Sequence, residues 1–176
     1  MRLLVSQIIG LLAVATFLLS YQQKKRKSII IWNVTSRVLY ITQYLLLGAY
    51  SGAALDVLGA VSSVIAEKKH TSFIKKHLKL FIIVINAIIL LVGLVIAIIN
   101  RSFLDVFPII GVLLHTGAFW MTSEKVIRRI SLLGSPFWLV YNLLSKAYGS
   151  AIGDVLTMAS IIIAMVKYRK EPNVTE

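Results

Sequence analysis

The chain contains one stretch of sequence twice. Residues 45–69 align without a gap to residues 143–167, and twelve of the 25 aligned positions hold the same residue. An apolar-rich chain would match itself by chance at roughly one position in ten, so the similarity indicates an internal duplication. The matches include Asp56 with Asp154, and shared apolar composition does not explain an aspartate that recurs inside an apolar segment. The chain is therefore expected to contain two similar units.

The class of protein follows from the hydrophobicity. Of the 176 residues, 58% are hydrophobic, and a soluble domain of this length could not bury so much apolar surface. The formal net charge of +12 does not indicate a nucleic-acid partner, because the Lys and Arg residues cluster in short loops between apolar segments. The absence of cysteine excludes disulfides and thiolate chemistry. We therefore expect an all-α membrane protein whose first partner is the lipid bilayer.

Seven apolar segments are predicted to form transmembrane helices, since a helix needs about 20 residues to cross the hydrocarbon. Residues 1–19 also resemble a signal peptide, but Ile8-Ile9-Gly10 recurs as Ile109-Ile110-Gly111, which favours a first span in the first unit. The seven segments are Leu3–Tyr21, Ile29–Gly48, Ala53–Ala66, Leu80–Ile99, Val106–Met121, Ile130–Leu144 and Ala151–Val166.

The basic residues predict the orientation of these spans. The loops after the first, third and fifth spans, together with the C-terminal tail, hold fifteen of the 19 Lys and Arg residues. Short cytoplasmic loops carry an excess of Lys and Arg. The amino terminus is therefore expected outside and the carboxyl terminus in the cytoplasm.

The fourth span explains how the two units can be parallel. A three-helix unit crosses the membrane an odd number of times, so a second unit joined directly would be inverted, and one extra crossing restores the orientation. The predicted fold is seven transmembrane helices arranged as two parallel three-helix repeats joined by a linker helix. The units are residues 3–66 (first repeat), 80–99 (linker), 106–166 (second repeat) and 167–176 (polar cytoplasmic tail).

Polar and aromatic residues form a stripe on the second span and another on the sixth. In the second span, Arg37, Tyr40, Gln43 and Tyr44 share one helical face by their spacing. The sixth span carries Trp138, Tyr141 and Asn142 at the positions that match Tyr40, Gln43 and Tyr44. Two interpretations stay open, and they are compatible: interhelical hydrogen bonding that holds the bundle together, and a face that lines a substrate site.

Three titratable residues lie inside the predicted spans. Asp56 and Asp154 should face the bundle interior or a water-filled cavity, because a carboxylate in hydrocarbon costs about 2.5–3.5 kcal/mol. They either bind a proton or a polar group of a substrate, or have a structural role by capping the preceding turn or by pairing with Arg37 or Lys146. His115 lies in the fifth span and is either a hydrogen-bonded packing residue or a proton-coupling group. Arg37, Asp56, Asp154 and His115 are the candidate gating or coupling groups.

The remaining features of the sequence concern anchoring, helix bending and the absence of catalytic motifs. Trp32, Trp120, Tyr50 and Tyr148 are interpreted as anchors at the membrane interface. Pro136 is expected to bend the sixth span. No metal-ligand spacing, phosphate-binding glycine loop or Ser/His/Asp set is visible, so no catalytic residue, metal or cofactor is expected and the chain is not predicted to be an enzyme.

Two segments resemble a known family. The segment Gln43–Ala53 (QYLLLGAYSGA), together with Trp138–Asn142 (WLVYN) and the following Tyr148-Gly149-Ser150, is similar to the YgjV family of bacterial inner-membrane proteins. The resemblance implies the inner membrane of a bacterium. The layout also resembles that of the SWEET sugar carriers and the PnuC vitamin transporters, in which parallel repeats surround a site near the midplane. The chain lacks the recognition motifs of both, so this likeness concerns the layout and not the substrate.

These observations favour a small-molecule transporter, facilitative or proton-coupled, with a site between the two repeats. Its aromatic and amide lining suits a neutral nucleoside-like or vitamin-like solute. The alternative is a membrane scaffold or assembly partner that does not transport; a membrane enzyme would need a catalytic cluster. The sequence leaves the formation of a homo-oligomer open. The expected substrate-binding residues are Tyr40, Gln43, Tyr44, Trp138, Tyr141 and Asn142.

Overall fold

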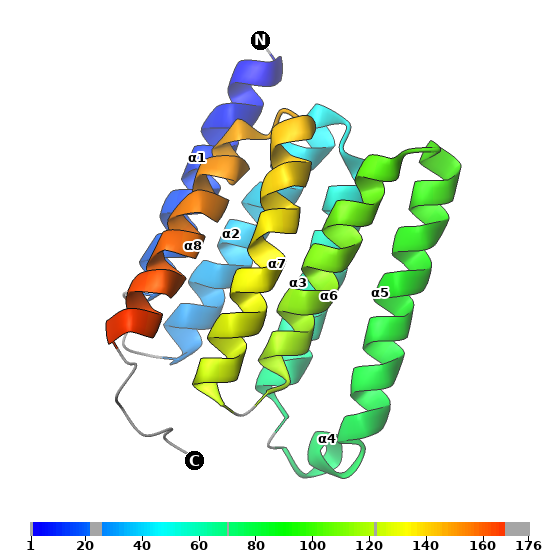
Figure 1. Cartoon of the computed structure of the whole chain (residues 1–176), viewed down its shortest axis with the longest axis vertical. Helices are drawn as coiled ribbons and strands as arrows, with labels where there is room; N and C mark the ends of the chain where they lie inside the picture. Colours follow the sequence, from blue (N-terminus) through cyan, green and yellow to red (C-terminus); the bar gives the residue numbers. More distant parts are fainter. Residues whose placement is uncertain (1, 22–25, 70, 122, 168–176) are drawn as a thin grey trace.

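The computed structural model describes residues 2–21, 26–69, 71–121 and 123–167, and these residues are helical apart from short turns (Figure 1). The elements are α1 (Arg2–Tyr21), α2 (Arg26–Leu47), α3 (Tyr50–Glu67), the short α4 (Ser72–Lys76), α5 (Leu78–Asn100), the 3-10 turn η1 (Phe103–Asp105), α6 (Val106–Phe119), α7 (Glu124–Leu144) and α8 (Tyr148–Lys167).

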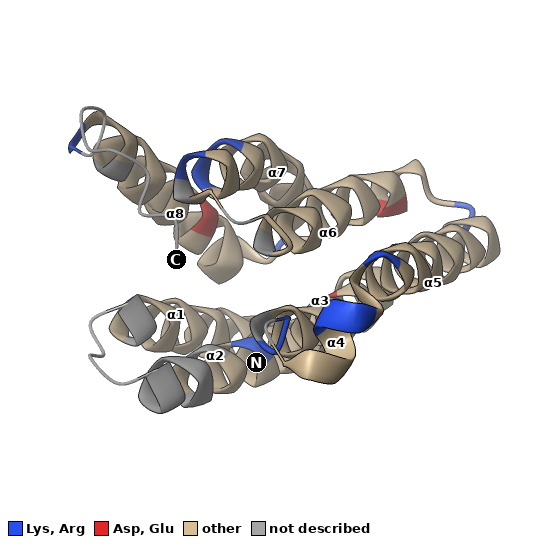
Figure 2. Ribbon diagram, turned by 90° about the horizontal axis from the view of Figure 1, so that it is seen from below, with Lys and Arg blue, Asp and Glu red and all other residues tan. Residues whose placement is uncertain are grey.

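The helices form two layers. Seen along the bundle, α1, α2 and α3 make one layer and α8, α7 and α6 make the other (Figure 2). Across the layers α1 packs against α8 and α3 packs against α6, while α5 packs on α3 and α6. The long helices alternate in direction, so α1 and α6 run the same way, and the start of α1 and the end of α8 lie at opposite ends of the bundle (Figure 1).

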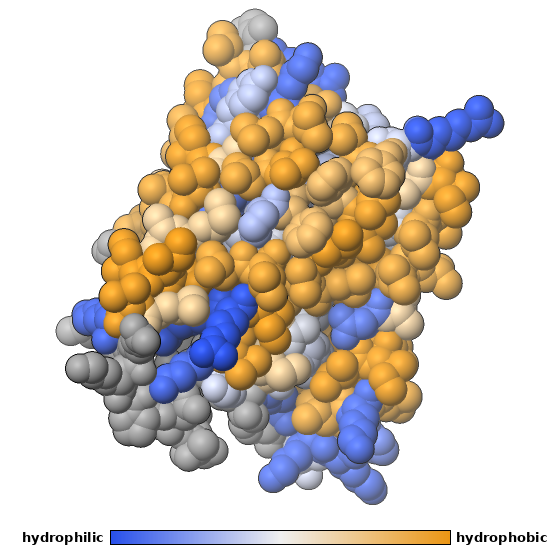
Figure 3. Space-filling view, in the orientation of Figure 1, coloured by the Kyte–Doolittle hydropathy of each residue, from blue (hydrophilic) through white to orange (hydrophobic). Residues whose placement is uncertain are grey.

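The outer surface of the bundle is apolar. On α5 the side chains of Ile83, Leu91, Ile98 and Ile99 are all more than 60% exposed. Hydrophobic residues cover most of the visible face, and hydrophilic ones gather mainly toward its two ends (Figure 3). Contiguous exposed apolar surface of this kind is unfavourable in water and suits a protein surrounded by lipid. The expected all-α membrane class is therefore confirmed.

The individual helices differ in how well they meet the criteria for a membrane span. Among the described residues, segments of α1, α5 and α8 are long and apolar enough to cross a membrane, and Tyr50–Ala66 and Phe103–Ala118 are shorter apolar helices. The helices α2 and α7 fall outside both groups. Each carries a polar stripe and begins with charged residues, and both features lower its hydropathy.

Several helices are longer than the sequence suggests. The structure begins α7 at Glu124 and not at Ile130, because charged residues that read as a loop continue the helix beyond the apolar segment. It begins α3 at Tyr50 and α8 at Tyr148, which shortens both preceding turns. The basic loop after α3 contains the short helix α4. Most of the predicted tail, together with Lys24, Lys25 and His70 of the basic loops, lies outside the described residues.

Trp120 is not the interfacial anchor that the sequence suggested. Its side chain is only 5% exposed, at the end of α6, and its indole nitrogen is buried without a hydrogen-bond partner among the described residues. Tyr50 and Tyr148 are 60% and 48% exposed, as anchors require. Pro136 lies inside the continuous helix α7.

Two turns of the same geometry join α2 to α3 and α7 to α8. Gly48 ends α2 with a φ of 75°, and Lys146 ends α7 with a φ of 59°. In the first turn the Ala49 amide donates to the Tyr44 carbonyl at 2.9 Å, and in the second the Ala147 amide donates to the Asn142 carbonyl at 2.8 Å. This bond from the residue after a left-handed residue is the Schellman ending of a helix.

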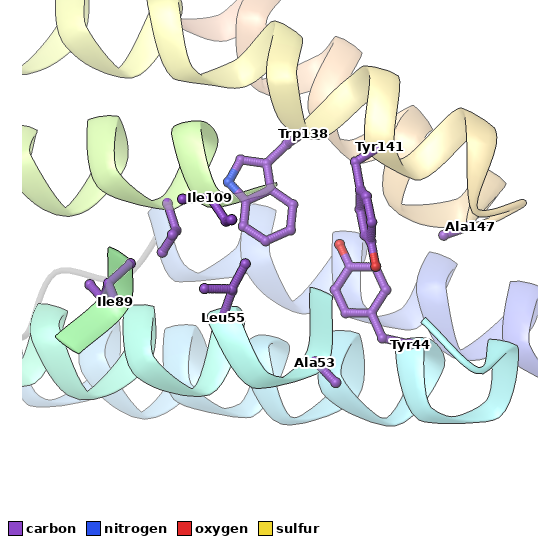
Figure 4. Close-up of a cluster of buried hydrophobic side chains, with 9 residues drawn as sticks. Tyr44, Ala53, Leu55, Ile89, Ile109, Trp138, Tyr141 and Ala147 are labelled. Carbon is purple, nitrogen blue, oxygen red and sulfur yellow. The ribbon is translucent and has the colours of Figure 1, made fainter. Parts of the chain in front are cut away.

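A buried cluster lies between the layers. Tyr44, Leu55, Ile109, Trp138 and Tyr141 converge from α2, α3, α6 and α7 (Figure 4). Ile89, which is fully buried, joins the cluster from α5. A Cβ atom on Gly93 would lie 2.5 Å from Ile109, so α5 approaches α6 closely at this glycine. The core therefore holds the two layers and α5 together.

Candidate functional site

A cavity of about 110 Å³, lined by both polar and apolar residues, lies between the helices of the bundle. Its lining comes from α1, α2, α3, α6, α7 and α8, so both layers contribute to it. A water molecule occupies about 30 Å³ of liquid, and the cavity therefore has room for several waters. The lining residues are Phe17, Ser36, Arg37, Tyr40, Tyr44, Asp56, Gly59, Val112, His115, Thr116, Ser135, Trp138, Asn142, Ser150, Gly153, Asp154 and Thr157.

One of the two repeated aspartates belongs to an ion pair. The Arg37 guanidinium donates to the Asp56 carboxylate at 2.7 Å, and the two side chains are 18% and 11% exposed. A second guanidinium nitrogen lies 3.5 Å from the Ser63 hydroxyl. The pair joins α2 to α3 at the wall of the cavity, as the structural interpretation of Asp56 expected.

The other aspartate has a neutral partner. The Asn142 side-chain amide donates to the Asp154 carboxylate at 2.7 Å, and the Tyr44 hydroxyl donates to the Asn142 side-chain oxygen at 2.8 Å. Asp154 therefore pairs neither with Arg37 nor with Lys146. Within the described residues no Lys or Arg side chain lies within ion-pair distance of it. Tyr44, Asn142 and Asp154 form one hydrogen-bonded chain across the layers.

His115 faces the cavity from α6. Its Nε2 atom lies 3.0 Å from the Ser131 carbonyl oxygen. A carbonyl only accepts hydrogen bonds, so Nε2 carries a proton and donates it. The Ser135 hydroxyl lies 3.4 Å from the same nitrogen. The contact to Ser131 holds the ring against α7.

Gln43 and Tyr141 do not line the cavity. The Gln43 side-chain oxygen accepts from the Ser150 hydroxyl at 2.5 Å, while a Cβ atom on Gly10 would collide with the same amide. The Tyr141 hydroxyl accepts from the Gly52 amide at 2.9 Å and lies 2.9 Å from the Ser51 hydroxyl.

The hydrogen bond between Gln43 and Ser150 joins α2 to the first turn of α8. The contacts of the Tyr141 hydroxyl join α7 to the first turn of α3. They connect the layers at the end of the bundle that holds the two Schellman turns. The same end is held by Gln7, whose side chain donates to the Lys146 carbonyl at 2.7 Å and accepts from the Gly149 amide at 3.0 Å.

The structure thus brings most of the expected site residues together and separates two of them. Arg37, Tyr40, Tyr44, Asp56, His115, Trp138, Asn142 and Asp154 line one cavity. Sequence reasoning missed most of the small polar residues of the lining, among them Ser36, Thr116, Ser150 and Thr157. Hydroxyl residues are common in transmembrane helices, so their presence alone gave no signal.

Among the described residues no group of three or more His, Asp, Glu or Cys side chains could hold a metal ion. No curated protein and no solved structure shows a significant match to the chain. A family model does match, over residues 4–172, and its description agrees with the apolar surface and with the resemblance seen in the sequence. The chain belongs to the Imp-YgjV family, described as a bacterial inner membrane protein.

Proposed function

We propose that the protein is a transporter of a small molecule across the inner membrane, with its site in the cavity between the two layers. The observation that carries the proposal is the lining of that cavity. Stacked aromatic rings, an amide and charged groups converge from both layers inside an apolar bundle. A scaffold needs no such interior, because its function lies on its outer surface.

The proposed architecture is two parallel three-helix repeats, α1–α3 and α6–α8, with α5 as the linker. The two Schellman turns support it, since Gly48 and Lys146 occupy equivalent positions in the duplicated sequence. The hydrogen bond from Tyr44 to Asn142 joins two residues that are also equivalent. A residue that contacts its own counterpart lies near a two-fold axis. Such an axis would run along the bundle, as in transporters built from parallel repeats.

The proposed orientation places the two Schellman turns outside and the basic loops in the cytoplasm. Gln43 with Ser150, and Tyr141 with Ser51 and Gly52, would then close the outer end of the cavity. These residues act as a gate in the proposal, and the residues below them line the site.

The proposed substrate is a neutral solute with a flat face and hydrogen-bonding groups. Tyr44 and Trp138 stack with their ring centroids 6.2 Å apart, and Asn142 lies beside them. Binding sites for such compounds measure roughly 300–1,000 Å³, more than the cavity offers. In this proposal the cavity has to widen to admit its substrate.

A ligand-induced thermal-shift screen of the purified protein tests this function. Neutral nucleosides and vitamin-like compounds are the first candidates, and a ligand present at 100 times its Kd stabilises a protein by about 2.7 kcal/mol. A compound that binds in the cavity should lose its shift in the Asn142→Ala and Trp138→Ala variants. Uptake of that compound into proteoliposomes should be lost in the same variants.

Val84→Ala is a matched control for these variants, because its side chain is 43% exposed on the outer face of α5. It should keep both the shift and the uptake. A hit that survives in Asn142→Ala and in Trp138→Ala contradicts the assigned site. Binding without any uptake favours the scaffold.

Asp154 is the proposed coupling group, because it lines the cavity and its only described partner is the neutral Asn142 amide. With the transported solute in hand, the Asp154→Asn variant should retain exchange of solute between the two sides at equilibrium. It should lose accumulation driven by a proton gradient. Accumulation at the native level in Asp154→Asn would show that the proton is coupled to transport through another residue.

A further inference from the structure

A groove with no residue in common with the central cavity lies between α7 and α8. It has a volume of about 350 Å³ and is lined by Lys125, Arg128 and Arg129 together with four apolar residues. Its lining residues belong to the first half of α7 and the last two turns of α8. The start of α7 and the end of α8 lie at the same end of the bundle (Figure 1). The apolar residues of its wall are Leu132, Ile162, Met165 and Val166.

The two kinds of residue occupy different parts of the groove. On α7 the basic residues precede Leu132 by one to two turns, so the positive charge lies toward the end of the bundle and the apolar wall toward its middle. Ile162 and Val166 are 50% and 72% exposed on α8, facing the surroundings of the bundle. Figure 3 shows a hydrophilic patch bordered by hydrophobic residues at the lower ends of these helices.

We propose that this groove binds one anionic phospholipid. The basic side chains would bind the phosphate of the headgroup, and an acyl chain would lie along Leu132, Ile162 and Val166. Arginine suits a phosphate group because its planar guanidinium donates two hydrogen bonds at once. Basic pockets between transmembrane helices bind lipid headgroups of this charge. A soluble anion would leave the apolar wall uncovered, so the groove fits a diacyl lipid better than a free phosphate.

The first half of the chain does not repeat this charge pattern. When the offset of 98 residues between the two copies is carried back from the aligned segment, Arg128 and Arg129 correspond to Ile30 and Ile31, while Lys125 corresponds to Lys27. The lipid site therefore belongs to one half, and its stoichiometry is one lipid for each chain.

Native mass spectrometry and thermal unfolding of the full-length protein test the proposal. Dioleoylphosphatidylglycerol should bind as a single retained copy and raise the melting temperature, and dioleoylphosphatidylcholine should do neither. Each basic side chain near an anionic lipid strengthens binding about fivefold, so Arg128→Gln/Arg129→Gln should weaken phosphatidylglycerol binding by roughly 30-fold. The Arg128→Lys/Arg129→Lys variant keeps the charge and should retain the lipid.

The matched control is Lys75→Gln/Lys76→Gln, which removes two exposed charges from α4 at the same end of the bundle. It should bind the lipid as the native protein does. The proposal would be overturned by equal stabilisation with phosphatidylcholine, by equal stabilisation with inorganic phosphate, or by a loss of binding in the α4 variant as large as in the arginine variant. Unchanged binding in Arg128→Gln/Arg129→Gln would also overturn it.

Discussion

Replacing Arg37 by alanine is expected to destabilise the protein by about 3 kcal/mol, because it leaves the buried Asp56 carboxylate without a cation. In a chain of this length that loss corresponds to a melting temperature roughly 6–12 °C lower. Thermal unfolding in detergent measures it directly. The effect should exceed that of any exposed charge, since an exposed Lys or Arg contributes at most about 1 kcal/mol.

A double variant separates the ion pair from other contacts of Arg37. Arg37→Ala/Asp56→Asn removes both charges and should recover more than half of the lost stability. Lys75→Ala, at an exposed position of α4, is the control and should lie close to the native protein. If the double variant is as unstable as Arg37→Ala, the ion pair is not the reason, and Arg37 stabilises the bundle through its other contacts, such as the one to Ser63.

Replacing Gly149 by valine should separate α1 from α8. A Cβ atom at Gly149 would lie 3.0 Å from the Gln7 carbonyl oxygen and from backbone carbons of Gly10. Backbone atoms cannot turn aside as a flexible side chain can, so the whole helix has to move. Overpacking of this kind costs about 3 kcal/mol, and the shift would also break the hydrogen bond from the Gly149 amide to Gln7.

Gly117 provides the matched substitution, because a Cβ atom there meets no atom of the described residues within 4 Å. Gly117→Val should change the free energy of unfolding by less than about 1 kcal/mol. Chemical denaturation of both variants in the same detergent compares them. Similar losses in the two variants would mean that close contact between α1 and α8 does not hold the bundle together.

Much of the fold can be predicted from the sequence. Long apolar segments and the basic loops between them mark the helices and turns, whatever the details of the packing. Each long helix of the described residues covers all or most of one of the predicted apolar segments. The family of the chain was recognised from two short sequence motifs. The helix ends were harder. Glu124 to Arg129 read as a loop because the residues are charged, yet backbone hydrogen bonds continue the helix where an apolar pattern stops.

The candidate site was predictable in part for a similar reason. Helical spacing puts Tyr40 and Tyr44 on one face, and both line the cavity. Gln43 adjoins Tyr44 in sequence, and only the rotation of α2 decides whether it faces the cavity or the neighbouring helix. That rotation depends on the close contact of Gln43 with Gly10. A sequence pattern contains no information about such a contact, so Gln43 and Tyr141 could not be separated from the lining.

The unequal partners of the repeated aspartates bear on why the two halves share one polypeptide. In the proposed architecture, a dimer of the first half alone would place two guanidinium–carboxylate pairs around the cavity, and a dimer of the second half would place two carboxylates beside amides. A dimer of identical units cannot hold one of each, whereas two different halves in one chain can. Once the two halves were joined in one chain, Asp154 could lose its counter-ion while Asp56 kept the ion pair that stabilises the bundle. Two identical subunits could not differ in this way.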